Sequence, residues 1–189
     1  MNDEEASHRD CARWLVQLSK DLGGVLSDLK RCGAKHGLHL LKGNHVSMEG
    51  STSLAYPESW ARTWFAIGLA PMENKSATGS VAYVFEIWLD PPFAYEEACV
   101  LGARIDLPRP MTRDEVYQGW RLIGRRLEES DRSDFSAPFS LSAELVEKSL
   151  SAFAGGGVSV VVVGLTELTN EAAVEQKLFD RVLATKAAK

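Results

Sequence analysis

The clearest pattern in the chain is an alternation of apolar and polar residues between Trp60 and Leu107. Successive side chains of a strand leave opposite faces of a sheet, so this alternation is typical of strands with one apolar face. It occurs in three segments, separated by a polar loop at 71–79 and by a loop with two prolines at 90–97. Because proline cannot donate to a strand ladder, it marks a strand end. The pattern predicts an antiparallel three-stranded meander over residues 60–107.

The same alternation predicts which side chains share a face of the meander. One face is expected to be apolar, and its members are Phe65, Ile67, Leu69, Val81, Tyr83, Phe85, Ile87, Leu89, Cys99, Leu101, Ala103, Ile105 and Leu107. The other face is expected to mix tryptophans with charges, and its members include Arg62, Trp64, Glu86, Trp88, Arg104 and Asp106. We therefore expect helices to pack on the first face. The second face could bind a partner; alternatively, Arg62, Glu86 and Arg104 form exposed cross-strand ion pairs and the tryptophans pack under a helix.

Apolar residues spaced by three and four predict a first helix over residues 7–31, with Ser7 as its N-cap. Its apolar stripe comprises Cys11, Leu15, Leu18, Leu22, Val25 and Leu29. The pair Gly23-Gly24 interrupts this helix, and each glycine costs about 1 kcal/mol relative to alanine in a helix interior. A kink or break is therefore expected there, and Gly33 and Gly37 are expected to end the helix.

The second half of the chain predicts three more helices and one more strand. Thr112 and Glu115 have the spacing of a capping box, which predicts a helix from this point to about residue 129. Further helices are expected at 142–154 and 170–187. The β-branched run at 158–165 between them is typical of a strand that is buried on both faces.

These elements predict an α+β fold in the order α-β-β-β-α-α-β-α. Helices would pack on an antiparallel sheet of three to five strands, made of the meander at 60–107 and the strand at 158–165. The length of 189 residues is sufficient for one domain with a sizeable core. We expect residues 1–189 to form that single domain, with a polar connector at 128–140 inside it.

Composition narrows the classes of function. The chain is acidic, with a net charge of −5, which argues against broad attraction to nucleic acid or to anionic membranes. Its polar first ten residues do not resemble a secretory signal, and no apolar run approaches the roughly 20 residues that span a bilayer. Three widely spaced cysteines are expected to be reduced thiols. These features predict a soluble protein of the cytoplasm.

A cluster of metal-ligand residue types lies between the first helix and the meander. It contains Cys32, His36, His39 and His45, all of which can bind zinc. A small hairpin over residues 38–48 would place His39 and His45 opposite each other. However, the cluster matches no paired CxxC or HExxH spacing, and exposed histidines on a polar connector are the alternative interpretation. We therefore expect no cofactor.

The element order, together with Glu86 and Asp90 on the second strand, resembles the core order of the PD-(D/E)xK nuclease superfamily. This resemblance implies a divalent metal and phosphodiester hydrolysis, with an acid on the second strand and a (D/E)xK triplet on the third. The third strand instead carries Arg104-Ile105-Asp106, with no lysine. A metal-dependent hydrolase with a degenerate site is therefore the alternative function.

The favoured function is a non-catalytic protein-binding module, such as an adaptor, a chaperone-like protein or an immunity-like inhibitor. The chain lacks nucleophile-elbow and phosphate-loop motifs, and tryptophan and arginine are enriched at protein interfaces. The loop at 90–97 adds two aromatic residues between prolines and acids. The partner, another protein or a second copy, is expected to contact Arg62, Trp64, Glu86, Trp88, Arg104, Asp106, Phe93 and Tyr95.

Overall fold

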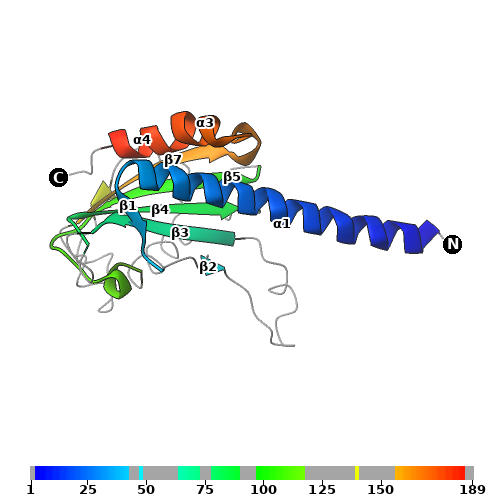
Figure 1. Ribbon diagram of the computed structural model, residues 1–189, viewed down its shortest axis with the longest axis horizontal. Coiled ribbons are helices and arrows are strands. Elements are labelled where there is room, and N and C mark those ends of the chain that lie inside the picture. The colour runs from blue at the N-terminus through cyan, green and yellow to red at the C-terminus, as the bar shows by residue number, and fades with distance from the viewer. Residues whose placement is uncertain are drawn as a thin grey trace.

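The computed structural model contains one antiparallel sheet with helices packed on it (Figure 1). It describes residues 3–42, 47–48, 64–72, 78–89, 97–117, 139–140 and 156–185. Four eight-residue strands make up most of the sheet: β3 (Trp64–Pro71), β4 (Val81–Trp88), β5 (Cys99–Asp106) and β7 (Gly157–Gly164). The predicted α+β class, the meander and the late buried strand are confirmed.

Three short strands complete the sheet: β1 (Leu38–Leu40), β2 (Ser47–Met48) and β6 (Phe139–Ser140). The strand order is β1-β3-β4-β5-β7-β6, and β2 also pairs with β3. The sheet ladders are antiparallel throughout. The predicted hairpin at 38–48 is wrong, because β1 and β2 lie one after the other along β3 and do not pair with each other.

Helix α1 (Asp3–Lys35) is continuous over 33 residues. The predicted break at Gly23-Gly24 and the N-cap at Ser7 are therefore both wrong. Beyond the glycine pair, Leu26 and Leu29 pack on the sheet and stabilise the helix against the cost of two glycines. The helix continues through Gly33 to Lys35, so the stop predicted at Gly33 is wrong. The stop predicted at Gly37 is confirmed, because Gly37 has the positive φ of 70° that follows many helices.

The last helical segment lies beside α1 on the same side of the sheet (Figure 1). A 3-10 turn, η3 (Leu165–Glu167), follows β7 and leads into α3 (Glu171–Val174), the π-helical turn η4 (Glu175–Phe179) and α4 (Asp180–Ala184). The predicted start is confirmed, since the Asn170 side chain caps the helix by accepting from the amide of Ala173 at 3.0 Å. Although α1 is long, no helix within the described ranges has the length and apolar character needed to cross a membrane.

The capping box predicted after the meander is also confirmed. The Thr112 amide donates to Glu115 Oε2 at 2.7 Å, and the Glu115 amide donates to Thr112 Oγ1 at 3.2 Å. A helix begins at the next residue, Arg113, and buries Val116 completely. Glu115 also pairs with Arg109, and these contacts lower the pKa of its carboxyl to about 2.

Both faces of the sheet carry apolar cores. The helical face, which α1, α3, η4 and α4 cover, includes Ile67, Leu69, Tyr83, Phe85, Ile87, Val100, Val161 and Val163. There, the ring of Phe179 stacks on that of Phe85 with centroids 5.2 Å apart. The opposite face includes Ala66, Val84, Trp88, Cys99, Leu101, Ala103, Ile105, Val158 and Val160, with Met111 and Val116 packed against it.

The predicted face of β5 is wrong. In the observed register Arg104 pairs with Tyr83 and Leu101 pairs with Glu86. The apolar residues that were predicted to face the helices, Cys99, Leu101, Ala103 and Ile105, therefore lie on the opposite face. The reason is Gly102, which lies under the last helix: a Cβ there would be 2.5 Å from Val182 Cγ2 and 3.0 Å from Leu178 Cδ1. Gly102 and the polar residues Arg104 and Asp106 of β5 therefore lie on the helical face.

Candidate partner-binding site

The structure divides the predicted mixed face between two sides of the sheet. Trp64, Glu86 and Trp88 lie together on the opposite face. Arg104 and Asp106 lie on the helical face, where they form an ion pair at 2.8 Å. The predicted contacts Arg62, Phe93 and Tyr95 lie outside the described residues.

The side chains of Glu86 and Trp88 are core residues in this chain, with 2% and 6% of their surface exposed. The Trp88 indole donates to Glu86 Oε2 at 3.1 Å, and the Trp64 ring packs on Trp88 with centroids 5.9 Å apart. Burial, with a contribution from the charge of Glu86, raises the pKa of the nearby Cys99 thiol to about 12. This region is therefore a buried packing site, and only the half-buried Trp64 retains surface for contacts.

Arg104 has a structural role on the helical face. Its guanidinium donates to the carbonyl of Thr185 at 2.7 Å and approaches the carbonyl of Leu183 at 3.5 Å. These carbonyls belong to the end of α4, where helical acceptors lack partners and attract cations. Arg104 therefore ties the end of the last helix to β5.

The acids expected from the nuclease-like order do not converge. Glu86 is on the opposite face and Asp106 is on the helical face, so the sheet separates their carboxyl groups. Asp90, the other candidate on the second strand, lies outside the described residues. Glu86 and Asp106 therefore do not share one site. The pair Glu86 and Asp90, on which the hydrolase prediction rested, is only partly within the described residues, so that alternative stays a prediction.

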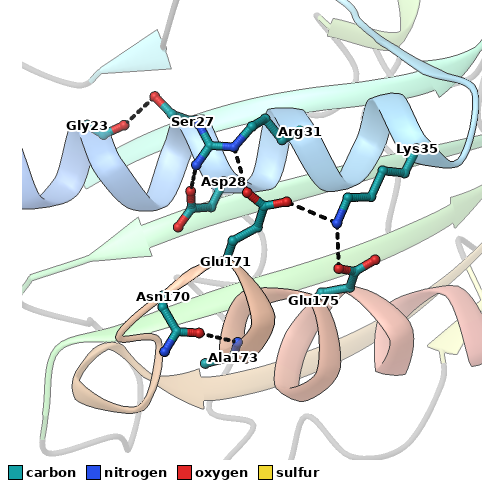
Figure 2. A network of polar contacts seen from close by, with 9 residues as sticks. All are labelled: Gly23, Ser27, Asp28, Arg31, Lys35, Asn170, Glu171, Ala173 and Glu175. Carbon is teal, nitrogen blue, oxygen red and sulfur yellow. Dashed lines mark hydrogen bonds and ion pairs between the residues drawn. The ribbon is translucent and has the colours of Figure 1, made fainter.

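A group of charged side chains links α1 to α3 and η4 (Figure 2). Arg31 Nε contacts Glu171 Oε2 at 2.7 Å, and Lys35 Nζ contacts Glu171 Oε1 at 2.9 Å and Glu175 Oε2 at 2.7 Å. Arg31 also pairs with Asp28 on its own helix. These bonds lower the pKa of Glu171 and raise that of Lys35, because each charge favours the other. The network holds the second half of α1 against α3.

Cys32 lies next to this network. Its sulfur and the carboxylate oxygens of Glu171 and Glu175 lie within 4.8 Å of one another, a donor set that could bind a metal ion. Two observations oppose that role. Burial, followed by the charge of Glu175, raises the pKa of Cys32 to about 11, so the thiol keeps its proton. Lys35 also contacts both carboxylates, which are therefore already neutralised.

The predicted histidine cluster does not form a metal-binding group in the part of the chain that the structure describes. His36 is exposed and stacks on Phe179, with ring centroids 5.4 Å apart and planes inclined by 21°. His39 is exposed on the edge strand β1, and His45 is outside the described residues. Cys32 instead meets two acids that lie about 140 residues later, a contact that no local motif could reveal.

Among the described residues, the exposed large apolar side chains are on the first half of α1, which projects beyond the sheet (Figure 1). Trp14, Leu15 and Val16 are 63%, 56% and 56% exposed. Among the side chains described in α1, the first buried one is Leu22. Leu15 and Leu18 belong to the same stripe as Leu22, so the stripe that docks α1 on the sheet continues past the sheet edge. Its first half was predicted to be buried, and that is wrong for Leu15.

A groove opens where α1 leaves the sheet. It has a volume of about 460 Å³ and runs between α1 and the segment that joins β7 to α3. Apolar side chains line it, namely Leu18, Leu22, Val25, Leu165 and Leu168. Polar residues and one glycine complete the lining, namely Lys20, Asp21, Gly24, Asp28 and Thr169. The groove is continuous with the exposed stripe because Leu18 belongs to both.

The helical spacing in the sequence predicted this apolar stripe, but it did not predict the point along α1 where the sheet beneath it ends. The clue was a difference in length. A helix of 33 residues is about 50 Å long, whereas an eight-residue strand spans only about 26 Å. The break expected at Gly23-Gly24 concealed that difference, because two short helices would both have fitted over the sheet.

No family model, curated protein or solved structure matches this chain. The fold and the surface themselves define the class, an α+β protein with a projecting amphipathic helix beside a groove.

Proposed function

We propose that this protein is a non-catalytic protein-binding module that acts through the projecting strip, defined as Trp14, Leu15, Val16, Leu18 and the adjoining groove. The observation that carries the proposal is the exposure of three consecutive large apolar side chains at 63%, 56% and 56%. Burying one such side chain is worth about 1.5–3 kcal/mol. Trp14 and Leu18, four positions apart, share one side of the helix, and Leu18 also lines the groove. An apolar surface next to a groove favours association over exposure to water.

The structure of the strip also suits binding. Tryptophan is enriched among the residues that dominate binding energy at interfaces, and Trp14 is the most exposed of the three. The strip lies on a continuous helix, so its side chains are held at fixed spacing before a partner arrives. Preorganisation of this kind reduces the entropy that association costs.

The chemistry of the described acids and thiols supports a binding role. Glu115 is bound to arginine and Glu171 to arginine and lysine, which lowers the pKa of both carboxyls and reduces their ability to transfer protons. Burial raises the pKa of both Cys32 and Cys99 and suppresses thiolate chemistry. We place the module in the cytoplasm, where buried free thiols of this kind remain reduced.

Site-specific photo-crosslinking in the native cell tests the proposal. A photoreactive residue at Gln17, which is exposed on the projecting half of α1, should form a covalent adduct with the partner. The control position is Gln176, which is exposed on the last helix and distant from the strip. Adding Trp14→Glu should abolish the adduct from position 17. Equal adducts from both positions, or none from position 17, would contradict the proposal.

A further inference from the structure

We infer that the pair Gly23-Gly24 is a hinge in α1, and that the helix before this pair swings about it and thereby opens and closes the groove. The hinge goes beyond the proposed function, because it is a property of the single chain and needs no partner. Although α1 is continuous, the pair lies where the helix leaves the sheet (Figure 1). It stands between Leu22 and Leu26, the first two buried side chains described in α1.

Neither packing nor backbone conformation requires a glycine at these two positions. No heavy atom lies within 4 Å of the place that a Cβ would occupy at Gly23 or at Gly24, and neither residue has a positive φ. Alanine would therefore fit at both positions, and it would stabilise the helix. What glycine adds instead is freedom of the backbone, here at two consecutive residues.

The hydroxyl of Ser27 lowers the cost of bending at this point. It donates to the carbonyl of Gly23 at 2.7 Å (Figure 2). In a regular helix the amide of Ser27 bonds to the same carbonyl. When the helix bends and that amide bond lengthens, the hydroxyl keeps the carbonyl hydrogen-bonded. Serine side chains that bond four residues back often bend helices for this reason.

The contacts that hold α1 differ on the two sides of the glycine pair. After the pair, apolar side chains pack on the sheet, and Arg31 and Lys35 are ion-paired with α3 and η4. Before the pair, Leu22 is the one buried side chain among those described, and Leu18 is partly buried against the same core. A swing of the helix therefore releases two apolar contacts and none of these ion pairs.

The groove lies across the hinge. Part of its wall comes from the helix before the glycine pair and includes Leu18, Lys20 and Leu22. The facing wall includes Leu165 and Leu168, on the segment that joins β7 to α3. The sheet and the ionic network hold that segment in place, so a swing of the helix changes the width of the groove, whose volume here is about 460 Å³.

Electron paramagnetic resonance of the full chain, with spin labels at Gln17→Cys and Gln176→Cys, tests the hinge. Both positions are exposed, the first before the glycine pair and the second on η4. Cys11→Ser removes one native thiol. Burial raises the pKa of Cys32 to about 11 and that of Cys99 to about 12, so these two thiols react slowly with the label. We expect a broad distribution of distances between the labels.

Two variants show whether the glycine pair causes this breadth. Gly23→Ala combined with Gly24→Ala should narrow the distribution at least twofold, because alanine restricts the backbone. Ser19→Ala is the matched control. It removes a hydroxyl that donates to the carbonyl of Leu15 at 2.9 Å, and it raises helix propensity before the hinge without changing the glycines. Its distribution should stay broad, whereas fraying of the first turns would respond to both variants.

A second pair of labels, at Lys20→Cys and Thr169→Cys in the same Cys11→Ser background, tests the effect on the groove. Both positions are exposed and lie on opposite walls of it. We expect their distances to cover a wide range in the chain with both glycines and a single narrow range in the double alanine variant.

A narrow distribution between positions 17 and 176 in the chain with both glycines would overturn the inference. So would a broad distribution that the double alanine variant leaves unchanged, or one that Ser19→Ala narrows equally. A constant distance between positions 20 and 169, with a broad one between 17 and 176, would show that the helix swings without opening the groove and would overturn that part.

Discussion

Single residues decide which side chains share a surface in this protein. Gly102 is the clearest case, because only a residue without a side chain fits beneath Val182 and Leu178. Its presence on the helical face places the neighbouring residues Leu101 and Ala103 on the other side of the sheet. The alternation within β5 was read correctly from the sequence, but a contact with a helix 80 residues later determined its orientation.

We expect Gly102→Ala to destabilise the fold by about 1–3 kcal/mol, because the new methyl group overpacks a closed core. Gly23→Ala is the matched control. Its Cβ meets no atom within 4 Å, and alanine is the better helix former by up to about 1 kcal/mol. Urea denaturation monitored by tryptophan fluorescence would measure both changes. An unaltered midpoint for Gly102→Ala would show that the last helix can move away from β5.

At the scale of elements, α1 divides into two halves with different environments. Its second half is held by apolar packing on the sheet and by the ionic network with α3, which joins residues about 140 positions apart. Its first half has no buried side chain among those described. The amphipathic pattern is the same in both halves, so sequence periodicity could not distinguish the docked half from the projecting half.

The ionic network should make the docking of α1 on α3 sensitive to acid. Contacts with Lys35 and Arg31 hold the folded-state pKa of Glu171 below its unfolded value of 4.5. A group with a lowered folded pKa contributes stability that is fully present above the unfolded pKa and is lost as the pH falls through the folded pKa. We therefore expect Glu171→Gln to reduce the free energy of unfolding at pH 7, and this difference to shrink below about pH 4.5.

Urea denaturation of the wild-type chain and of Glu171→Gln between pH 7 and pH 3 would check this dependence. High salt at pH 7 should reduce the difference as well, since the network is largely exposed. A difference that stays constant over the whole pH range would mean that the carboxylate does not stabilise the fold through its charge.

At the scale of the whole molecule, the sheet has a core on each face, and the exposed apolar surface described is on the helix that extends past it. The protein thus separates the residues that maintain its fold from those that we propose for binding. Glu86 and Trp88, which were predicted to bind a partner, are buried and maintain the fold. Trp14 and Leu15, which were assigned to no site from the sequence, are exposed and belong to the surface that we propose for binding.

This separation predicts unequal effects of two leucine substitutions in one helix. Leu29→Ala should destabilise the chain by about 2–5 kcal/mol, because Leu29 is fully buried against the sheet. Leu15→Ala should change stability by no more than about 0.5 kcal/mol in dilute solution, where the strip has no partner. Denaturation at low protein concentration would compare them. A large loss for Leu15→Ala would indicate that the projecting half contributes to the fold of the single chain.

Local sequence alone was enough to place the strands β3, β4, β5 and β7, the cap at Asn170 and the box at Thr112. These features depend on residues within a few positions of one another, through alternation, helical spacing and capping bonds. Tertiary structure decided the rest: the orientation of β5, the pairing of Cys32 with two distant acids, and the point where α1 leaves the sheet. Each of these depends on contacts between elements far apart in the chain. The periodic pattern within one helix or strand predicts which of its residues share a face. It does not predict which other element packs on that face.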